Sequence, residues 1–373
     1  MEKIKVNLNF GELKKGITNS ITDVDGVTVG HYTIKNGAFH TGVTAILPHQ
    51  GNTFTEKVIG ANYVINGFGK SIGLTQIDEL GTIESPIILT NTLSVGTCAT
   101  GLIKYMLSNN EDIGVTTGTV NSVVCECNDG WLNDIRSFQV KEEHVTEAIF
   151  NASKNFQLGA VGSGTGMKSF GLKGGIGSSS RVVSLDGHEY TLGILVMSNF
   201  GRLSRLTLCG KNIGKNIKYQ IKNNLAINTQ SDATEKSFCH CDKKDQAIND
   251  NESDKGSIII VLATDIPLNE RQLKRLCKRA TIGLARTGSD LGNGSGDIVV
   301  GFTTANKQLH YEKRDIIPAY QLNENIMDTL FSAMADATEE AIIRSLLESK
   351  TTVGRDGHIA YSLSDFIEQT NIL

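Results

Sequence analysis

The sequence of 373 residues predicts an α+β fold. Short runs rich in β-branched residues, bounded by Gly, Asn or Pro, recur through the first half of the chain and predict strands. Two long segments with apolar residues at helical spacing follow at 269–288 and 323–350. Strands and helices do not alternate strictly, and this irregular order favours layered α+β packing over a parallel α/β sheet.

The expected elements can be placed in order along the chain. Strands are expected at 27–34, 42–48, 57–68, 85–92, 180–185, 190–201, 205–214, 257–268 and 297–306. Helices are expected at 95–109, 140–155, 269–288 and 323–350. Residues 222–256 are rich in Asn, Asp, Lys and Ser, and a segment of this composition buries too little surface to offset its ordering entropy. We therefore expect a flexible tract there.

Composition excludes several classes of function. The formal net charge is −4 and no long basic run occurs, so we expect neither nucleic acid nor a membrane surface as a partner. No segment approaches the roughly 18 apolar residues of a membrane span. The N-terminal residues alternate apolar with charged and do not resemble a secretory signal. The seven cysteines are an odd number, which favours reduced thiols and a cytoplasmic protein.

Three short patterns carry weak signals for other chemistries. Residues 162–169, GSGTGMKS, resemble a phosphate loop but have Met167 where that loop requires Gly. Ser71 lies in a G-x-S-x-G pattern, and Asp297 with His310 or His358 follows in the order of an α/β-hydrolase-type serine esterase. The segment Cys239, His240, Cys241 offers three metal ligands but no fourth nearby.

The step from Gly256 to Ser257 is the stronger candidate. A polar tract runs through Gly256 directly into the apolar strand that begins at Ser257. If the bond before Ser257 were cut, the serine would carry its own α-amine, with an ordinary pKa near 7.7–8.0. That amine could take the proton from the hydroxyl of the same residue, as in N-terminal nucleophile enzymes.

The sequence also resembles a known family, the self-processing N-terminal serine hydrolases that include L-aminopeptidase/D-esterase and the β-peptidyl aminopeptidases. The resemblance runs in order from about Ile17 to His358. Its motifs are NSITDVDGVTVGHYT, TGVTAILPH, NGFGKSIGLTQIDELGTIESPIILTNT, CNDGWLNDI, VGSGTGM, GILVMSNFG, GSIIIVLATDIPL, RTGSDLGNGSGDIVVGFTTAN and TTVGRDGH. It implies one domain over 1–373 with an αββα sandwich, the DOM fold, and cleavage into an α chain, 1–256, and a β chain, 257–373.

The resemblance also implies roles for individual residues. Ser257 matches the nucleophile released by cleavage after Gly256, and Asn199 matches the oxyanion donor. Ser295 and Asp297 match the pair that orients the nucleophile, although many relatives have Glu at the position of Asp297.

Two further matches concern the substrate. Glu126 matches the carboxylate that binds the substrate's ammonium, and Trp131 matches the wall of the pocket, where some relatives have Tyr. The expected substrate is a small peptide, amide or ester with a free amine, and the expected chemistry needs neither a metal nor an organic cofactor. The resemblance also implies a homo-oligomer of processed αβ units.

Two rivals share this architecture. An acyltransferase of the ornithine acetyltransferase kind would use Thr at the cut, which Ser257 disfavours. The other rival is a binding protein that keeps the fold uncut and has no catalytic activity.

Overall fold

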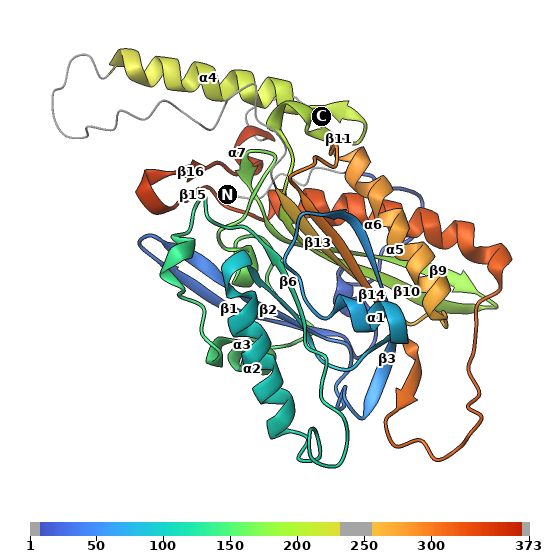
Figure 1. Ribbon diagram of the computed structural model, residues 1–373. Coiled ribbons are helices and arrows are strands. Elements are labelled where there is room, and N and C mark those ends of the chain that lie inside the picture. Colours follow the sequence, from blue (N-terminus) through green and yellow to red (C-terminus); the bar gives the residue numbers. More distant parts are fainter. Residues whose placement is uncertain (1–7, 232–255, 368–373) are drawn as a thin grey trace.

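The protein is described by a computed structural model that covers residues 8–231 and 256–367. Its core is a pair of stacked β-sheets with helices on both outer faces (Figure 1). The structure confirms the predicted α+β class and the αββα layering. Among the described helices, none combines the length and the apolarity needed to cross a bilayer.

The larger sheet has six strands and carries the candidate nucleophile. In spatial order they are β4 (Thr82–Ile83), β3 (Glu56–Gly67), β14 (Gly296–Leu309), β13 (Ser257–Thr264), β10 (His188–Asn199) and β9 (Gly175–Leu185). The pair β13–β14 is parallel, and the other neighbours are antiparallel.

The smaller sheet has four strands and carries the candidate amine-binding carboxylate. In spatial order they are β1 (Thr28–Asn36), β2 (Phe39–Leu47), β5 (Ile87–Asn91) and β6 (Val123–Cys127). Only the pair β5–β6 is parallel.

Helices cover the outer face of each sheet. The larger sheet is covered by α5 (Glu270–Arg286) and α6 (Met327–Leu347), and the smaller one by α2 (Val95–Ser108) and α3 (Glu143–Phe150). The remaining helices are α1 (Leu74–Leu80), α4 (Gly214–Ser231) and α7 (Ser364–Ile367). Short 3-10 helices and three hairpins of two-residue strands lie between these elements. The hairpins are β7 (Lys168–Ser169) with β8 (Leu172–Lys173), β11 (Thr207–Leu208) with β12 (Lys211–Asn212), and β15 (Thr352–Val353) with β16 (Ile359–Ala360).

Strand β13 shows why these layers form. All eight of its residues are buried, as expected for a central strand with both faces covered. Because side chains alternate along a strand, Ile258 and Ile260 enter the core under α5 and α6, whereas Ile259 and Val261 enter the core between the two sheets. A uniformly apolar strand after a polar tract is therefore the sequence signature of the central strand.

The predicted flexible tract 222–256 begins inside a helix. Helix α4 continues to Ser231, and residues 232–255 lie outside the described part of the chain. The start of the tract is helical because Ile213, Ile217 and Ile221, spaced four residues apart, are buried on one side of the chain.

Candidate active site

Ser257 occupies the first position of β13, at the end of the larger sheet. Its two neighbours in register are Asn199, the last residue of β10, and Gly296, the first residue of β14. The residue is 5% exposed. Gly256 and Ser257 are joined in the structure, so the geometry is that of the unbroken chain.

The carbonyl group of Gly256 is held on two sides. The Ser257 hydroxyl donates to the Gly256 oxygen at 2.7 Å, and the Gly296 N–H donates to the same oxygen at 3.1 Å. The second contact is a bond of the parallel ladder between β13 and β14. A backbone donor is therefore already placed where negative charge would develop if Ser257 attacked this carbonyl.

Gly256 and Gly296 both lie where a side chain has no room. A Cβ at Gly256 would lie 2.3 Å from the Asn199 carbonyl oxygen, and one at Gly296 would lie 2.8 Å from the Phe68 carbonyl oxygen. Real Cβ atoms do not approach backbone this closely. The absence of side chains lets three backbone segments meet around the Gly256 carbonyl.

The side chain of Asn199 is fixed by two backbone groups. Its Oδ1 accepts from the Lys168 N–H at 2.8 Å, and its Nδ2 donates to the Asn128 carbonyl at 2.9 Å. These contacts determine which end of the amide is the donor. An amide N–H₂ has two hydrogens, so Asn199 keeps one for another acceptor.

Ser295 and Asp297 flank Gly296 at the start of β14. Ser295 Oγ donates to Asp297 Oδ1 at 2.6 Å, and both residues are 1% exposed. The register between β14 and β3 shifts immediately after Asp297. Bulges of this kind often occur beside functional sites. The structure thus brings Ser295 and Asp297 together on either side of Gly296, which is the register partner of Ser257.

Glu126 is a buried carboxylate on β6 with neutral partners. Oε1 accepts from the Lys70 N–H at 2.8 Å, and Oε2 accepts from the Thr92 hydroxyl. It is 2% exposed, and no basic side chain of the described residues forms an ion pair with it. Buried carboxylates are usually paired with a cation. This carboxylate is suited to accept an ammonium group from outside the chain.

Gly69 connects Glu126 to the end of the larger sheet. A Cβ at Gly69 would lie 3.6 Å from Glu126 Oε1 and 3.8 Å from Gly296 Cα. Glu126 and the start of β14, where Gly296 lies, therefore line the same small region.

Trp131 lies in the loop after β6, between two basic side chains. Its ring stacks on His358 at a centroid distance of 4.0 Å, and Lys168 Nζ lies 4.2 Å from its centroid. The Trp131 Nε1 hydrogen is buried and has no hydrogen-bond partner among the described residues. Because the same loop supplies the Asn128 carbonyl to Asn199, Trp131 is close in sequence to the site.

The structure contradicts the alternative that uses Ser71. His310 contacts Thr117 at 2.7 Å and Lys57 at 3.2 Å, and the Nδ1 atom of His358 contacts the Trp131 carbonyl at 2.8 Å. Ser71 itself lies in the loop before α1, where its side chain contacts the buried thiol of Cys125. The two histidines are thus engaged elsewhere, and the required triad does not form. The following helix, α1, has only seven residues.

The other two weak signals also lose support. In 162–169 the backbone donors are already used, because the Gly162 N–H binds Thr33 Oγ1 at 2.7 Å and the Ser163 N–H binds Thr44 Oγ1 at 3.1 Å. The segment is a buried connection and cannot wrap a phosphate. Cys239, His240 and Cys241 lie outside the described residues, within which no cluster of three or more metal-ligating side chains occurs.

The thiols near the site are not nucleophiles. Burial raises the pKa of Cys125 to about 12 and raises the pKa of Cys127 well above its usual value, with Glu126 and Asp297 adding to the effect at Cys127. Both thiols remain neutral near pH 7, and a neutral thiol is a poor nucleophile. Ser257 is the hydroxyl that the fold places at the strand end.

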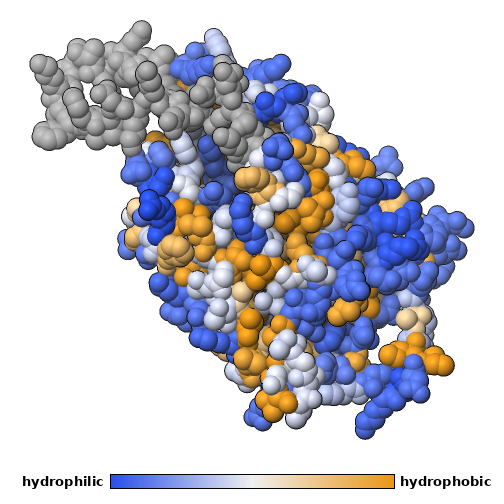
Figure 2. All heavy atoms as spheres, in the orientation of Figure 1, coloured by the Kyte–Doolittle hydropathy of each residue, from blue (hydrophilic) through white to orange (hydrophobic). Residues whose placement is uncertain are grey.

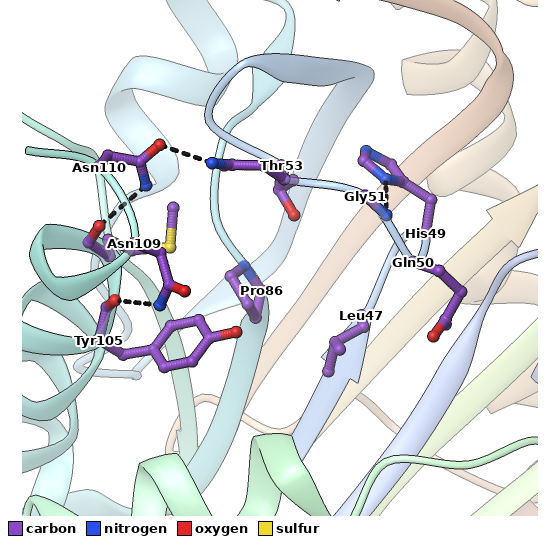
Figure 3. A pocket seen from close by; sticks show the side chains of 11 residues that line it. Leu47, His49, Gln50, Gly51, Thr53, Pro86, Tyr105, Asn109 and Asn110 are labelled. Atoms are coloured by element: carbon purple, nitrogen blue, oxygen red, sulfur yellow. Dashed lines mark hydrogen bonds between the residues drawn. The ribbon is translucent and has the colours of Figure 1, made fainter.

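A separate cavity of about 260 Å³ lies at the opposite end of the smaller sheet (Figure 3). Its lining is uncharged, and several of its polar groups bond within the chain. Asn52 donates to Asn110 at 2.6 Å, and the Gly51 N–H donates to His49 Nδ1 at 3.0 Å. The residues that line it include no carboxylate and none of the predicted site residues, so the cavity is separate from the site around Ser257.

Comparison with known proteins identifies the class of enzyme. Residues 19–360 match the model of peptidase family S58, and the chain belongs to this family. It is a serine aminopeptidase, a hydrolase, of that family.

Three relatives illustrate the similarity. The beta-peptidyl aminopeptidase BapA of Sphingosinicella microcystinivorans is 36% identical, over 92% of this chain and 85% of that protein. The PH0078 protein of Pyrococcus horikoshii OT3 has 48% identity and a TM-score of 0.86, over 99% of this chain and 98% of that one. The L-aminopeptidase D-Ala-esterase/amidase of Ochrobactrum anthropi has 31% identity and a TM-score of 0.82, over 96% and 95%. The last is described as a variant of the Ntn hydrolase fold, which the present fold matches.

Several residues of the site were not singled out from the sequence. The Gly296 and Lys168 N–H groups and the Asn128 carbonyl act through the backbone, so their side chains give no signal. The buried residues Asp129 and Lys173 offered a local signal, because each charged residue stands directly before a glycine.

Proposed function

We propose that the chain is a self-cleaving aminopeptidase in which Ser257 becomes the N-terminal nucleophile of residues 257–373. The observation that carries the proposal is the placement of the Ser257 hydroxyl 2.7 Å from the Gly256 carbonyl oxygen, with Asn199 directly opposite on β10. Membership of the S58 family supports the aminopeptidase activity.

The first stage is cleavage of the chain. Ser257 Oγ attacks the Gly256 carbonyl carbon, and the bond from that carbon to the Ser257 nitrogen breaks. The nitrogen leaves with a proton as the free α-amine, and Gly256 is then joined to Oγ as an ester. Water hydrolyses the ester to a Gly256 carboxylate and restores the hydroxyl. The Gly296 N–H stabilises the charge on the carbonyl oxygen during the attack.

The second stage is substrate hydrolysis. The new α-amine of Ser257 takes the proton from Oγ, which attacks the substrate carbonyl. The leaving amine or alcohol departs with a proton, and water releases the acyl group from Oγ. Asn199 Nδ2 donates its second hydrogen to the oxyanion, and the Ser295–Asp297 pair orients the nucleophile and its amine.

Glu126 selects substrates with a free amine. Its buried carboxylate has two neutral donors and no ion-pair partner among the described residues, so a substrate ammonium completes its surroundings. Trp131 forms the adjacent wall. Peptides, amides and esters share the required carbonyl and differ only in the leaving group.

Substrates with an N-terminal β-amino acid are included in the proposal. Relatives at 36% and 34% identity are beta-peptidyl aminopeptidases, and they support this choice. A panel of L-, D- and β-aminoacyl p-nitroanilides measures the preference directly. Hydrolysis confined to L- or D-α-aminoacyl compounds would refute the β-peptidyl part and leave the aminopeptidase activity intact.

Denaturing electrophoresis tests self-cleavage. The purified chain should give two bands that sum to 40.3 kDa, and Edman sequencing of the smaller should begin at Ser257. The Ser257→Ala variant should remain a single band and have no activity. A wild-type chain that stays whole yet hydrolyses peptides would overturn the mechanism. A whole and inactive chain would favour the uncut binding protein.

We also propose a cytoplasmic homo-oligomer of processed units. The loop after β14 exposes Ile316 (86%) and Tyr320 (81%), and apolar side chains are visible at this edge of the molecule in Figure 2. Exposed apolar groups of this kind are common at subunit contacts. Light scattering on the processed protein gives its mass, and a monomer at micromolar concentration would refute the assembly. Cell fractionation tests the location.

A further inference from the structure

Lys173 is a fully buried lysine in the β7–β8 hairpin. Its Nζ donates to three backbone carbonyls, those of Gly164 at 3.0 Å, Met167 at 2.8 Å and Gly174 at 2.6 Å. Three acceptors at these distances require three N–H bonds, which only the ammonium form has. The Lys173 side chain therefore links the two ends of the segment 164–174 through the carbonyls of Gly164 and Gly174.

Lys173 interacts electrostatically with a buried carboxyl group, that of Asp129. Burial, with a smaller contribution from Lys35, lowers the pKa of Lys173 to about 7, and Asp129 opposes this change. Burial likewise raises the pKa of Asp129 to about 7. His40, whose pKa is lowered by burial and by Lys35 and Lys173, is a further titratable group near these two residues. The three carbonyl contacts favour the charged lysine over the neutral amine.

The two charged residues lie beside the two groups that fix Asn199. Lys173 is the register partner of Lys168, whose N–H donates to Asn199 Oδ1. Asp129 follows Asn128, whose carbonyl accepts from Asn199 Nδ2. Each backbone contact of Asn199 thus comes from a segment that one member of the buried pair anchors.

We propose that Lys173 is a positioning residue for the reaction, and that it acts through Asn199. Its ammonium fixes the 164–174 segment, so that the Lys168 N–H fixes Oδ1 and turns the free Nδ2 hydrogen toward the oxyanion. This inference rests on the proposed oxyanion role of Asn199. It adds a supporting residue, Lys173, that takes part in none of the chemical steps.

The first test is the Lys173→Met variant. We expect kcat to fall about 10- to 100-fold, the range expected for a displaced catalytic group, with KM changed less than about threefold. Self-cleavage should proceed normally because the Gly256 carbonyl is bound by the Gly296 N–H and not by Asn199. A purely structural role would reduce folding yield and both reactions together.

Ser349→Ala is the matched control. Ser349 is also buried, and its hydroxyl donates to the same Gly174 carbonyl at 2.8 Å, but it does not contact Gly164 or Met167. This variant should lower Tm and leave kcat unchanged. If Lys173→Met does not fold, Lys173→Gln, which keeps an N–H₂ donor, provides the same comparison. An unchanged kcat in the folded Lys173 variant would overturn the inference.

A double-mutant cycle separates the two proposals. If Lys173 acts through Asn199, adding Lys173→Met to Asn199→Ala should cause no further loss of kcat. Additive losses would refute the inference and leave the role of Asn199 standing. A normal kcat in Asn199→Ala alone would instead refute the oxyanion assignment itself.

Discussion

Asn199 and Ser257 are directly opposed residues of the antiparallel strands β10 and β13. Directly opposed residues point to the same face of a sheet, so both side chains belong to the face between the two sheets. The first prediction follows from this pairing. Asn199→Ala should lower kcat about 10²–10³-fold, the usual cost of losing an oxyanion donor.

The same variant should still cleave itself, because the donor to the Gly256 carbonyl is the Gly296 N–H. Gel analysis and p-nitroanilide kinetics measure the two reactions separately. Ser198→Ala, at the adjacent buried position, is the control and should be nearly as active as wild type. Equal loss of both reactions in Asn199→Ala would contradict the use of separate donors.

Glu126→Gln should weaken the recognition of amine substrates. The amide keeps acceptor capacity but loses the charge, and a hydrogen bond to a charged group contributes about 1.5–3 kcal/mol. We expect kcat/KM to fall about 10- to 100-fold. Analogues that lack the α- or β-amine should be hydrolysed equally slowly by both enzymes.

The control for this prediction is Glu84→Gln. Glu84 is also a buried carboxylate, but it pairs with Lys57 at 2.9 Å. The control should lose stability and retain KM. If Glu126→Gln retained wild-type kinetics with amine substrates, another group would have to bind the ammonium.

Gly256→Ala should slow self-cleavage by more than about tenfold. The new methyl group would lie 2.3 Å from the Asn199 carbonyl oxygen and 2.4 Å from Phe200 Cα, so the scissile carbonyl must move. The time course of band conversion during expression measures the effect. Gly118→Ala, where a Cβ meets no atom within 4 Å, should cleave at the normal rate. Normal conversion in Gly256→Ala would show that the backbone there adjusts freely.

The environment of His31 predicts that the free energy of unfolding falls in acid. Its Nδ1 contacts Thr44 Oγ1 and its Nε2 contacts the Gln157 carbonyl, both at 3.0 Å, and burial lowers its pKa from 6.5 to about 4. The unfolded chain therefore binds more protons between these values, so stability falls as pH falls from 6.5 to 4. The expected contribution is about 2 kcal/mol, which allows for the partial exposure of the residue.

Thermal unfolding of wild type and His31→Gln between pH 7 and 4 isolates this contribution from that of the carboxylates. The difference in Tm between the two proteins should change across the window in favour of the variant. Parallel curves would show that His31 does not titrate in this range.

The local elements could be predicted from the sequence because their signals are local. The helix expected at 95–109 is α2 (Val95–Ser108), and the strand expected from 257 begins at Ser257. Helix α4 was missed because its composition is polar, and only the four-residue spacing of its buried isoleucines indicates it.

The site was predictable only in part. The resemblance drew attention to Ser257 and Asn199, but their opposition in register depends on strands that are distant in sequence. The role of Lys173 could not be predicted, because its three acceptors are backbone carbonyls, which any residue supplies. The role of the Gly296 N–H could not be predicted either, since any residue except proline carries that donor.

The order of strands in the larger sheet has a consequence for the fragments. Strands β13 and β14 lie between β3 and β10, and α5 and α6 cover the sheet that all four strands share. A break before Ser257 would leave the two polypeptides interlaced, with the shorter one inserted through the middle of the longer one's sheet. They could not dissociate without dismantling the whole layer, so the nicked enzyme should purify as one particle and, once denatured, should not reassemble readily from separated pieces.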